Sequence, residues 1–257
     1  MFASDHAGAA LVTGASRGIG RVIARRLAQA GVAVAINYRQ SRVEAEALVA
    51  EIEGGGTRAV ALQADVSRPE QATDLFRRAE AELGAIDIVM NNAGITRDRL
   101  LIQMSEDDWD ATWSTNLGGP RAIARIALSA MCGRRRGRLI NIGSVVGSFG
   151  NSGQANYAAS KSGLLGLTRQ LAIACAASGV TVNCVVPGYI MTDATAGLSE
   201  LQREQWLRMI PMRRYATAEE VAEVALFLAG PGATYVTGQC IAVDGGLLAA
   251  AGAGLAS

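Results

Sequence analysis

The sequence contains one histidine and one lysine among its 257 residues. The histidine, His6, precedes the first predicted strand, so the core lacks the histidine that a serine–histidine–aspartate hydrolase needs. The same scarcity argues against a zinc site built from histidine and cysteine, and the sequence indicates no bound metal. A general acid in this chain must therefore be a tyrosine, an aspartate, a glutamate, a cysteine or the lysine, Lys161.

Long apolar runs, paired cysteines and excess charge are missing as well. No segment reaches the roughly 18–20 apolar residues of a membrane span, and the first residues lack the pattern of a secretory signal. The four cysteines form no CxxC pair, which is typical of free thiols in a reducing compartment. The formal net charge of +1 gives no general attraction to nucleic acid. We therefore expect a cytoplasmic protein that binds neither membranes nor nucleic acid.

Apolar segments of strand length alternate with helix-length segments along the whole chain, and its length fits one domain, residues 1–257, better than two. We predict strands at Ala9–Thr13, Val32–Asn37, Ala59–Gln63, Ile86–Asn91, Arg138–Gly143, Thr181–Val186 and Cys240–Val243. We predict helices at Gly18–Ala30, Arg42–Glu53, Pro69–Leu83, Glu106–Met131, Gly153–Ser178 and Ala218–Leu228. Apolar strands joined by helical crossovers predict a single-domain, Rossmann-like doubly wound α/β fold, with a seven-stranded parallel sheet covered by helices on both faces.

Three segments depart from the alternation. Residues 187–214 carry a short predicted helix, Ser199–Met209, and are typical of a substrate flap over a site. Pro120 lies inside the predicted helix Glu106–Met131 and is expected to kink it. Residues 248–257 are rich in alanine and glycine, and we expect a loose C-terminal tail there.

A glycine-rich turn, TGASRGIG at residues 13–20, follows the first predicted strand. Glycines at such a turn let the backbone approach a pyrophosphate, and the helix N-terminus offers free N–H groups and a positive dipole end. The spacing is GxxxGxG rather than the more common GxGxxG. The turn predicts dinucleotide contacts from Gly14, Ser16, Arg17, Gly18, Ile19 and Gly20.

The second predicted strand runs into Arg39 and offers no acidic residue for the 2′-hydroxyl of an adenosine ribose. Two guanidiniums, Arg17 and Arg39, can instead hold a 2′-phosphate, so the sequence predicts NADP(H). The alternative is that Arg39 simply points to water. Ligands of open α/β sheets bind at the carboxyl ends of the strands. Further cofactor contacts are therefore predicted at Asp65, Val66, Asn92, Ala93, Gly94, Pro187, Gly188, Ile190 and Thr192.

Lys161 follows Tyr157 by four residues, which places both side chains on one face of a helix, about 5–6 Å apart at Cβ. Arginine serves at every other basic position, but a guanidinium does not replace a compact ammonium beside a phenol. A phenol next to a fixed cation is an acid–base pair. The spacing taken alone favours a solvated helix face, and only the motifs around it favour the acid–base pair.

These motifs, in this order and spacing, resemble those of the short-chain dehydrogenase/reductases. The resemblance covers Leu11 to Gly246 and includes NNAG at residues 91–94 and YxxxK at residues 157–161. It implies four catalytic residues: Asn116, Ser144, Tyr157 and Lys161. Tyr157 is implied as the proton donor to a carbonyl, with Lys161 favouring the phenolate and holding the nicotinamide ribose. Ser144 is implied to bond the substrate carbonyl, and Asn116 to support a water chain.

Within that family, the sequence is most similar to the 3-oxoacyl-(acyl carrier protein) reductases, at NAGITRD (92–98), IGSVVG (142–147) and GQANYAASK (153–161). The similarity implies NADPH-dependent reduction of a 3-oxoacyl thioester by a homotetramer. Val145, Gln154 and Tyr189 would border the acyl pocket together with Ser144 and Tyr157. The alternatives are another carbonyl substrate (acetoacetyl-CoA, a polyketide intermediate or a small ketone) and a non-catalytic NADP-sensing protein.

Acyl carrier proteins are acidic, so a basic rim is expected near the mouth of the site. The run Arg134, Arg135, Arg136 and Arg138 matches such a region, and Arg169 extends it. Ser178 departs from the family pattern, because this position is often basic in these reductases. The other interpretation of the arginine run is a solvated loop.

Overall fold

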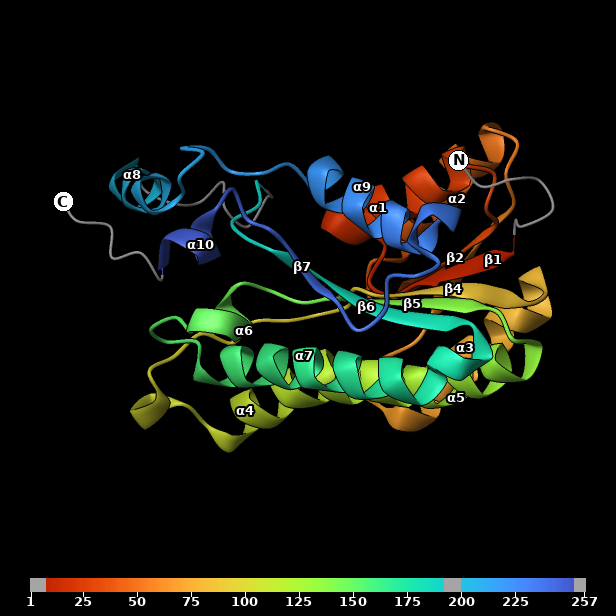
Figure 1. Cartoon of the computed structure of the whole chain (residues 1–257), viewed down its shortest axis with the longest axis horizontal. Coiled ribbons are helices and arrows are strands. Elements are labelled where there is room, and N and C mark those ends of the chain that lie inside the picture. Colours follow the sequence, from red (N-terminus) through yellow and green to blue (C-terminus); the bar gives the residue numbers. More distant parts are fainter. Residues whose placement is uncertain (1–7, 192–199, 252–257) are drawn as a thin grey trace.

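The computed structural model describes residues 8–191 and 200–251. Seven parallel strands form one sheet in the order β3-β2-β1-β4-β5-β6-β7 (Figure 1). The strands are β1 (Ala9–Val12), β2 (Val34–Tyr38), β3 (Ala59–Gln63), β4 (Ile86–Asn91), β5 (Gly137–Ile142), β6 (Val180–Pro187) and β7 (Cys240–Val243). The predicted doubly wound α/β fold is confirmed.

Helices cover both faces of the sheet (Figure 1). One face carries α1 (Gly18–Gln29), α2 (Arg42–Gly54) and α9 (Ala218–Ala229), and the other carries α3 (Pro69–Leu83), α5 (Gly119–Arg134) and α7 (Ala155–Cys175). Along β1, Ala10 and Val12 pack into the first layer while Ala9 and Leu11 pack into the second. Burial on both faces explains why the strands are apolar throughout rather than alternating. Among the described residues, no helix is long and apolar enough to cross a membrane.

The predicted helix Glu106–Met131 is broken into α4 (Glu106–Trp113), a π-helical turn (Ser114–Gly118) and α5. In a regular helix the ring of Pro120 would meet the carbonyl of residue 116, and the wider turn removes that clash. Pro120 then lies in the first turn of α5, where its missing N–H costs little. The interruption therefore begins one turn before the proline rather than at it.

Two short helices were not predicted, namely α6 (Val146–Phe149) and α10 (Leu247–Ala251). The prediction of a loose tail is wrong for residues 248–251, because the carboxylate of Asp244 accepts the N–H groups of Gly246 and Leu248 and starts α10. Residues 252–257 lie outside the described part. The helix predicted in the flap is observed as α8 (Glu200–Met209), while residues 192–199, including Thr192, are also outside the described part.

Candidate active site

Loops at the carboxyl ends of β1, β2, β3 and β4 enclose a cavity of about 320 Å³. The predicted cofactor residues that line it are Gly14, Ser16, Arg17, Ile19, Arg39, Asp65, Val66, Asn92, Ala93 and Gly94. Residues that the sequence analysis missed also line it: Asn37, Tyr38, Gln40, Ser41, Ala64, Ile95 and Thr115. Most of these continue the strand ends already identified, so extending each predicted strand end by two or three residues would have found them.

The glycine-rich turn forms the floor of this cavity because only glycine fits its closest approaches. Gly14 has a φ of +60°, and a Cβ there would lie 2.9 Å from the Cα of Ala93. A Cβ on Gly20 would lie 2.7 Å from the carbonyl oxygen of Gly14. The side-chain amide of Asn92 donates to the carbonyls of Thr13, at 2.9 Å, and Gly14, at 3.1 Å, which ties the turn to the end of β4.

Helix α1 begins at Gly18, within the glycine-rich segment, and no described side chain caps its first turn. Its free N–H groups and positive dipole end suit a phosphate. Arg17 and Arg39 are exposed on the cavity wall, and neither pairs with a carboxylate in the described part of the chain. The cavity therefore fits the pyrophosphate of a dinucleotide and offers two cations for a further phosphate.

Tyr157 and Lys161 lie at the same edge of the sheet as the cavity, on the first two turns of α7. Lys161 is only 4% exposed, and its Nζ donates to the carbonyl of Ile142 at 2.7 Å. The same Nζ lies 5.7 Å from the ring centroid of Tyr157. A Cβ on Gly94, which lines the cavity, would be 3.7 Å from Nζ. The ammonium thus lies near both the ring of Tyr157 and the loop at Gly94, and the catalytic roles of the two side chains stay predictions.

Ser144 and Asn116 are buried close to this pair in the fold. Ser144 follows β5, and its Oγ accepts the N–H of Val146 at 3.2 Å, where α6 begins. Asn116 lies in the π-helical turn, and its amide bonds both the N–H and the carbonyl of Ile95, at 2.9 and 3.0 Å. Its Nδ2 also donates to Ser160 on α7 at 3.2 Å. Asn116 therefore ties the loop after β4 to α7, and its role in a water chain stays a prediction.

The predicted substrate residues are distributed over two places. Val145 is buried beside Ser144, and Gln154 donates to Asp98 at 2.9 Å just before α7. Tyr189 stacks on Trp206 at 4.5 Å, and burial raises the pKa of its phenol. Tyr189 lines a second cavity, of about 350 Å³, between the flap and β7, and neither Ser144 nor Tyr157 lines it.

The predicted contacts after β6 are only partly described. Pro187 ends β6, and Gly188 packs so closely that a Cβ would lie 2.8 Å from the Cα of Asp244. Ile190 is buried and pairs with Ala216 in an isolated bridge. This bridge fixes the base of the flap beside the end of β6, so the flap leaves the sheet at its carboxyl edge.

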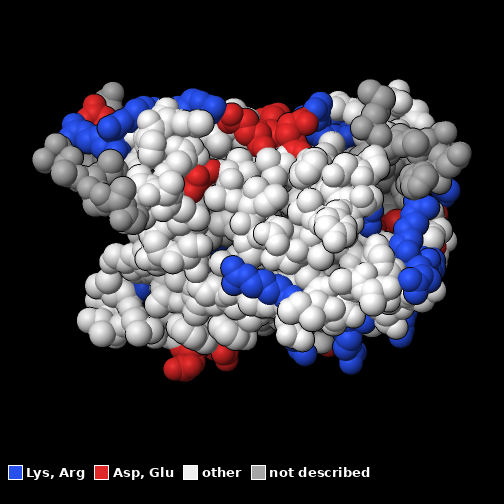
Figure 2. All heavy atoms as spheres, in the orientation of Figure 1, with Lys and Arg blue, Asp and Glu red and all other residues white. Residues whose placement is uncertain are grey.

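The prediction that the arginine run borders the site mouth is wrong for the chain's own site. Residues 134–138 precede and begin β5, so they lie at the amino edge of the sheet, whereas Tyr157 and Lys161 lie at the carboxyl edge. Basic side chains gather at this end of the molecule, the right-hand end of Figure 1, in the space-filling view (Figure 2). Two of the four arginines pair with carboxylates inside the chain: Arg134 bonds Glu80 at 3.1 Å and Arg136 bonds Asp87 at 3.0 Å.

Fold and site together define a class of protein: a Rossmann-type protein with a tyrosine–lysine pair at the same edge of the sheet as a cavity formed by a glycine-rich turn. Within the described residues, no three histidine, cysteine, aspartate or glutamate side chains gather as a metal site.

Comparisons with known proteins agree with this class. The family described as enoyl-(acyl carrier protein) reductase matches residues 14–248. A 3-oxoacyl-(acyl carrier protein) reductase of Staphylococcus aureus strain Mu50 is 46% identical over 238 residues, covering 93% of this chain and 97% of the relative. The reductase of the same name from Pseudomonas aeruginosa is 47% identical over 238 residues, covering 93% of this chain and 96% of the relative. The chain belongs to the short-chain dehydrogenase/reductase family.

A solved structure is similar over nearly the whole fold. It is a blue fluorescent protein from a metagenomic library in complex with NADPH, 40% identical, with a TM-score of 0.88. The similarity covers 93% of this chain and 97% of that chain.

Proposed function

We propose that the protein is an NADPH-dependent oxidoreductase that reduces a 3-oxoacyl thioester to the 3-hydroxyacyl thioester. The observation that carries the proposal is the buried Lys161 ammonium, which lies between the phenol of Tyr157 and the Gly94 loop of the dinucleotide cavity. The curated relatives at 46–47% identity are named for this reaction, which supports the choice of substrate.

In the proposed reaction Tyr157 donates its phenolic proton to the carbonyl oxygen of the substrate. The ammonium of Lys161 stabilises the phenolate that remains, because no described carboxylate neutralises it. Ser144 accepts a backbone N–H through Oγ, which leaves its hydroxyl proton for the same carbonyl oxygen. NADPH supplies the hydride when bound. The hydride goes to carbon and the proton to oxygen, so the ketone becomes a secondary alcohol.

Arg17 and Arg39 would select the cofactor. Both guanidiniums border the cavity beside the end of β2 without a carboxylate partner in the described residues, and a guanidinium binds phosphate oxygens in a bidentate manner. An acidic residue, which would favour the free 2′-hydroxyl of NADH, is absent from the end of β2. We therefore include NADP(H) rather than NAD(H) in the proposal.

The carrier, assembly and compartment are also proposals. The relatives' names support an acyl carrier protein as the carrier of the substrate. Residues 163–175 of α7 contain one charged residue, Arg169, and Ile173 is exposed, which supports burial of this helix in a homotetramer. The arginine run at residues 134–138 lies at the amino edge of the sheet, away from the chain's own site. It would help to dock a carrier protein only if that carrier delivers its acyl group to the site of another copy of the chain. Four free thiols support a cytoplasmic location.

The proposal is tested by following the absorbance of NADPH with an acetoacetyl thioester and, in parallel, a crotonyl thioester. We expect oxidation of NADPH with the 3-oxo substrate and little with the enoyl substrate. Tyr157→Phe should lower kcat by about 10²–10⁴-fold while leaving NADPH binding intact. Near-normal turnover of this variant would remove Tyr157 as the acid. A wild-type protein inactive with every thioester and ketone would favour an NADP-sensing role.

A further inference from the structure

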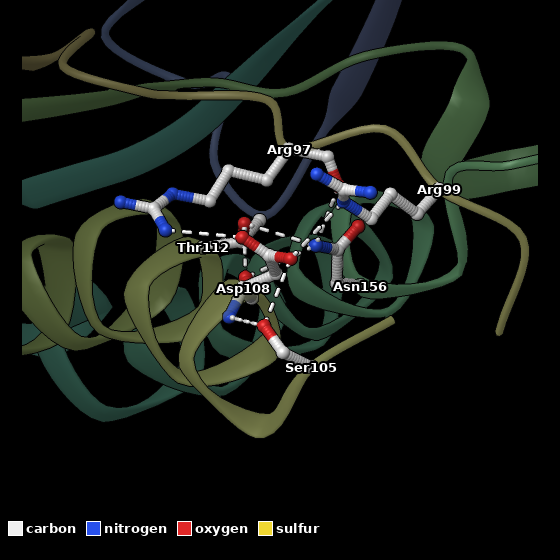
Figure 3. Close-up of polar contacts among 6 residues, drawn as sticks. All are labelled: Arg97, Arg99, Ser105, Asp108, Thr112 and Asn156. Atoms are coloured by element: carbon white, nitrogen blue, oxygen red, sulfur yellow. Dashed lines mark hydrogen bonds and ion pairs between the residues drawn. The ribbon is translucent and has the colours of Figure 1, made fainter. Parts of the chain in front are cut away.

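Asn156, the residue before Tyr157, is fully buried at the start of α7, and the nitrogen of its side-chain amide points toward α4 and the loop before it (Figure 3). Its Nδ2 lies 3.1 Å from each of three oxygens: the carbonyls of Arg97 and Asp108, and Oγ1 of Thr112. Its Oδ1 accepts the backbone N–H of Tyr157 at 2.7 Å. One side chain thus joins the loop after β4, helix α4 and helix α7.

The hydrogen bond to Tyr157 replaces an ordinary helix cap. An N-cap side chain normally accepts the N–H two or three residues into the helix. The residue at this position, Gln154, makes no such bond, because its amide is engaged with Asp98 and Asn151. The N–H that needs a partner here belongs to Tyr157, and Asn156 satisfies it from within the first turn.

The oxygens that Asn156 contacts are held in place by a cluster around Asp108 (Figure 3). The carboxylate of Asp108 pairs with Arg97 at 3.0 Å and with Arg99 at 3.5 Å, and it accepts the hydroxyl of Ser105 at 2.9 Å. The hydrogen bond from Arg97 is the largest cause that lowers the pKa of Asp108, followed by that from Ser105. The charged carboxylate therefore fastens the loop of residues 97–99 to the start of α4.

Tyr157 and Lys161 are held by different contacts. Lys161 bonds the carbonyl of Ile142, and α6 packs against it so closely that a Cβ on Gly147 would lie 2.9 Å from its backbone carbonyl carbon. Asn156 contacts neither Ile142 nor Gly147. Loss of the Asn156 amide would therefore release the first turn of α7, with Tyr157, and leave Lys161 where it is.

We propose that Asn156 is a positioning residue, which sets the place of the Tyr157 phenol relative to Lys161 and to the loop that continues from the dinucleotide cavity. The proposal rests on the proposed function of Tyr157 as proton donor. It goes beyond that function because Asn156 itself touches no substrate or cofactor atom: it acts through the backbone of its neighbour.

The first test compares Asn156→Ala with Asn183→Ala. Asn183 is a matched control, because it is also fully buried and also bonds backbone on both sides, at Val236 and Gln239, but on strand β6. Both variants should lose stability. Only Asn156→Ala should lower kcat, by about 10–100-fold, because small displacements of a reacting group cost rate. Its Kd for NADPH should stay within about twofold of wild type, and its kcat–pH profile should be displaced.

A kcat for Asn156→Ala equal to that of Asn183→Ala would overturn the proposal. So would a fall in NADPH affinity as large as the fall in kcat, because that pattern indicates general loss of structure.

If Asn156→Ala does not fold, conservative substitutions at Thr112 test the same proposal. Thr112→Val removes one oxygen that Asn156 contacts and keeps the shape, whereas Thr112→Ser keeps the oxygen. We expect the valine variant to lose several-fold in kcat and the serine variant to stay close to wild type. Equal activity of the two variants contradicts the proposal.

Amide hydrogen exchange separates this proposal from the proposed function. In Thr112→Val or Asn156→Ala, the N–H of Tyr157 should exchange faster while the amides after Lys161 keep the wild-type rate. This result supports the positioning role even if no thioester is reduced. Unchanged exchange at Tyr157 would reject the role even if the enzyme is active.

Discussion

The two edges of the sheet use positive charge in opposite ways. At the amino edge, where the strands begin, Arg134 and Arg136 pair with Glu80 and Asp87. At the carboxyl edge, where the strands end, Lys161 bonds only a backbone carbonyl in the described part of the chain. Arg17 and Arg39, beside the cavity at this second edge, likewise have no carboxylate partner among the described residues.

This difference separates charges that are neutralised inside the chain from charges that have no carboxylate partner among the described residues. A carboxylate beside Lys161 would neutralise the ammonium and compete with a developing phenolate. A carboxylate beside Arg39 would compete with a phosphate in the same way. The arginines at the amino edge have their partners inside the chain, so they contribute to stability rather than to binding by the chain's own site.

The largest expected effect is that of Lys161→Arg at the carboxyl edge. The planar guanidinium does not fit the closed space beside Ile142 and Gly147 as a compact ammonium does. We expect kcat to fall about 100-fold or more in a steady-state assay with NADPH and an acetoacetyl thioester. The matched control is the reverse exchange at an exposed position, Arg169→Lys, which should keep wild-type activity. A fully active Lys161→Arg would end the distinction drawn between the two edges.

Arg39→Ala tests the second unpaired cation at this edge. Loss of a charged hydrogen bond to phosphate should raise the KM for NADPH about 10–100-fold and leave the KM for NADH almost unchanged. Arg42→Ala is the control, because Arg42 already pairs with Glu46 and does not line the cavity. Equal changes for both cofactors would mean that Arg39 points to water.

At the amino edge, Asp87→Asn should affect stability alone. The variant removes the negative charge that pairs with both Arg134 and Arg136. Burial also lowers the pKa of the neighbouring Arg138 guanidinium, so the region holds positive charge that Asp87 helps to balance. We expect the free energy of unfolding, measured by urea titration, to fall by about 1–2 kcal/mol, with kcat unchanged.

Its control is Asp74→Asn, which breaks an exposed pair with Arg78 and should cost about 0.5 kcal/mol or less. Lower kcat for Asp87→Asn would mean that the two edges are coupled.

The smallest expected effect is on the reactivity of the Cys240 thiol. It lies near Arg169, which has no carboxylate partner among the described residues. The hydrogen bond from Cys184 lowers the pKa of Cys240 to about 7, and Arg169 adds to this, whereas burial raises the pKa of Cys175 to about 11. At pH 8 Cys240 should therefore be mostly thiolate and Cys175 thiol, so iodoacetamide should modify Cys240 first. Its alkylation rate should rise with pH around a midpoint near 7, and Arg169→Gln should move this midpoint upward.

If the alkylation rate of Cys240 follows the pH dependence of an ordinary free thiol, neither Cys184 nor Arg169 lowers its pKa; if Arg169→Gln leaves the midpoint unchanged, Arg169 has no part in it.

The sequence was sufficient for the sheet, because strands buried on both faces are apolar throughout and end in recognisable turns. Strand β5, for example, is observed at Gly137–Ile142, one residue from its predicted position. The positions of the residues that line the cavity could also be predicted, since the carboxyl ends of parallel strands meet at one edge. The order of the strands, β3-β2-β1-β4-β5-β6-β7, was not predicted and is known only from the structure.

What the sequence did not predict depends on tertiary contacts. The π-helical turn at Ser114–Gly118 places Asn116 against Ile95, a contact across 21 residues that no local pattern encodes. The sequence of the basic run resembled a docking surface, but Arg134 pairs with Glu80 inside the chain, a contact that the local sequence does not reveal. Asn156 was visible only as a neighbour of Tyr157, because its partners come from α4 and from the loop before it.

Lys161, the only lysine in the sequence, is buried in α7. Cleavage after this residue therefore reports the unfolding of that helix. A protease that cuts after lysine has one target in the 257 residues, the peptide bond between Lys161 and Ser162, which the folded helix protects. Digestion would divide the chain into fragments 1–161 and 162–257 only when that helix unwinds. The rate at which these two fragments appear on a gel thus measures, without any label, how often the helix that contains Lys161 unfolds.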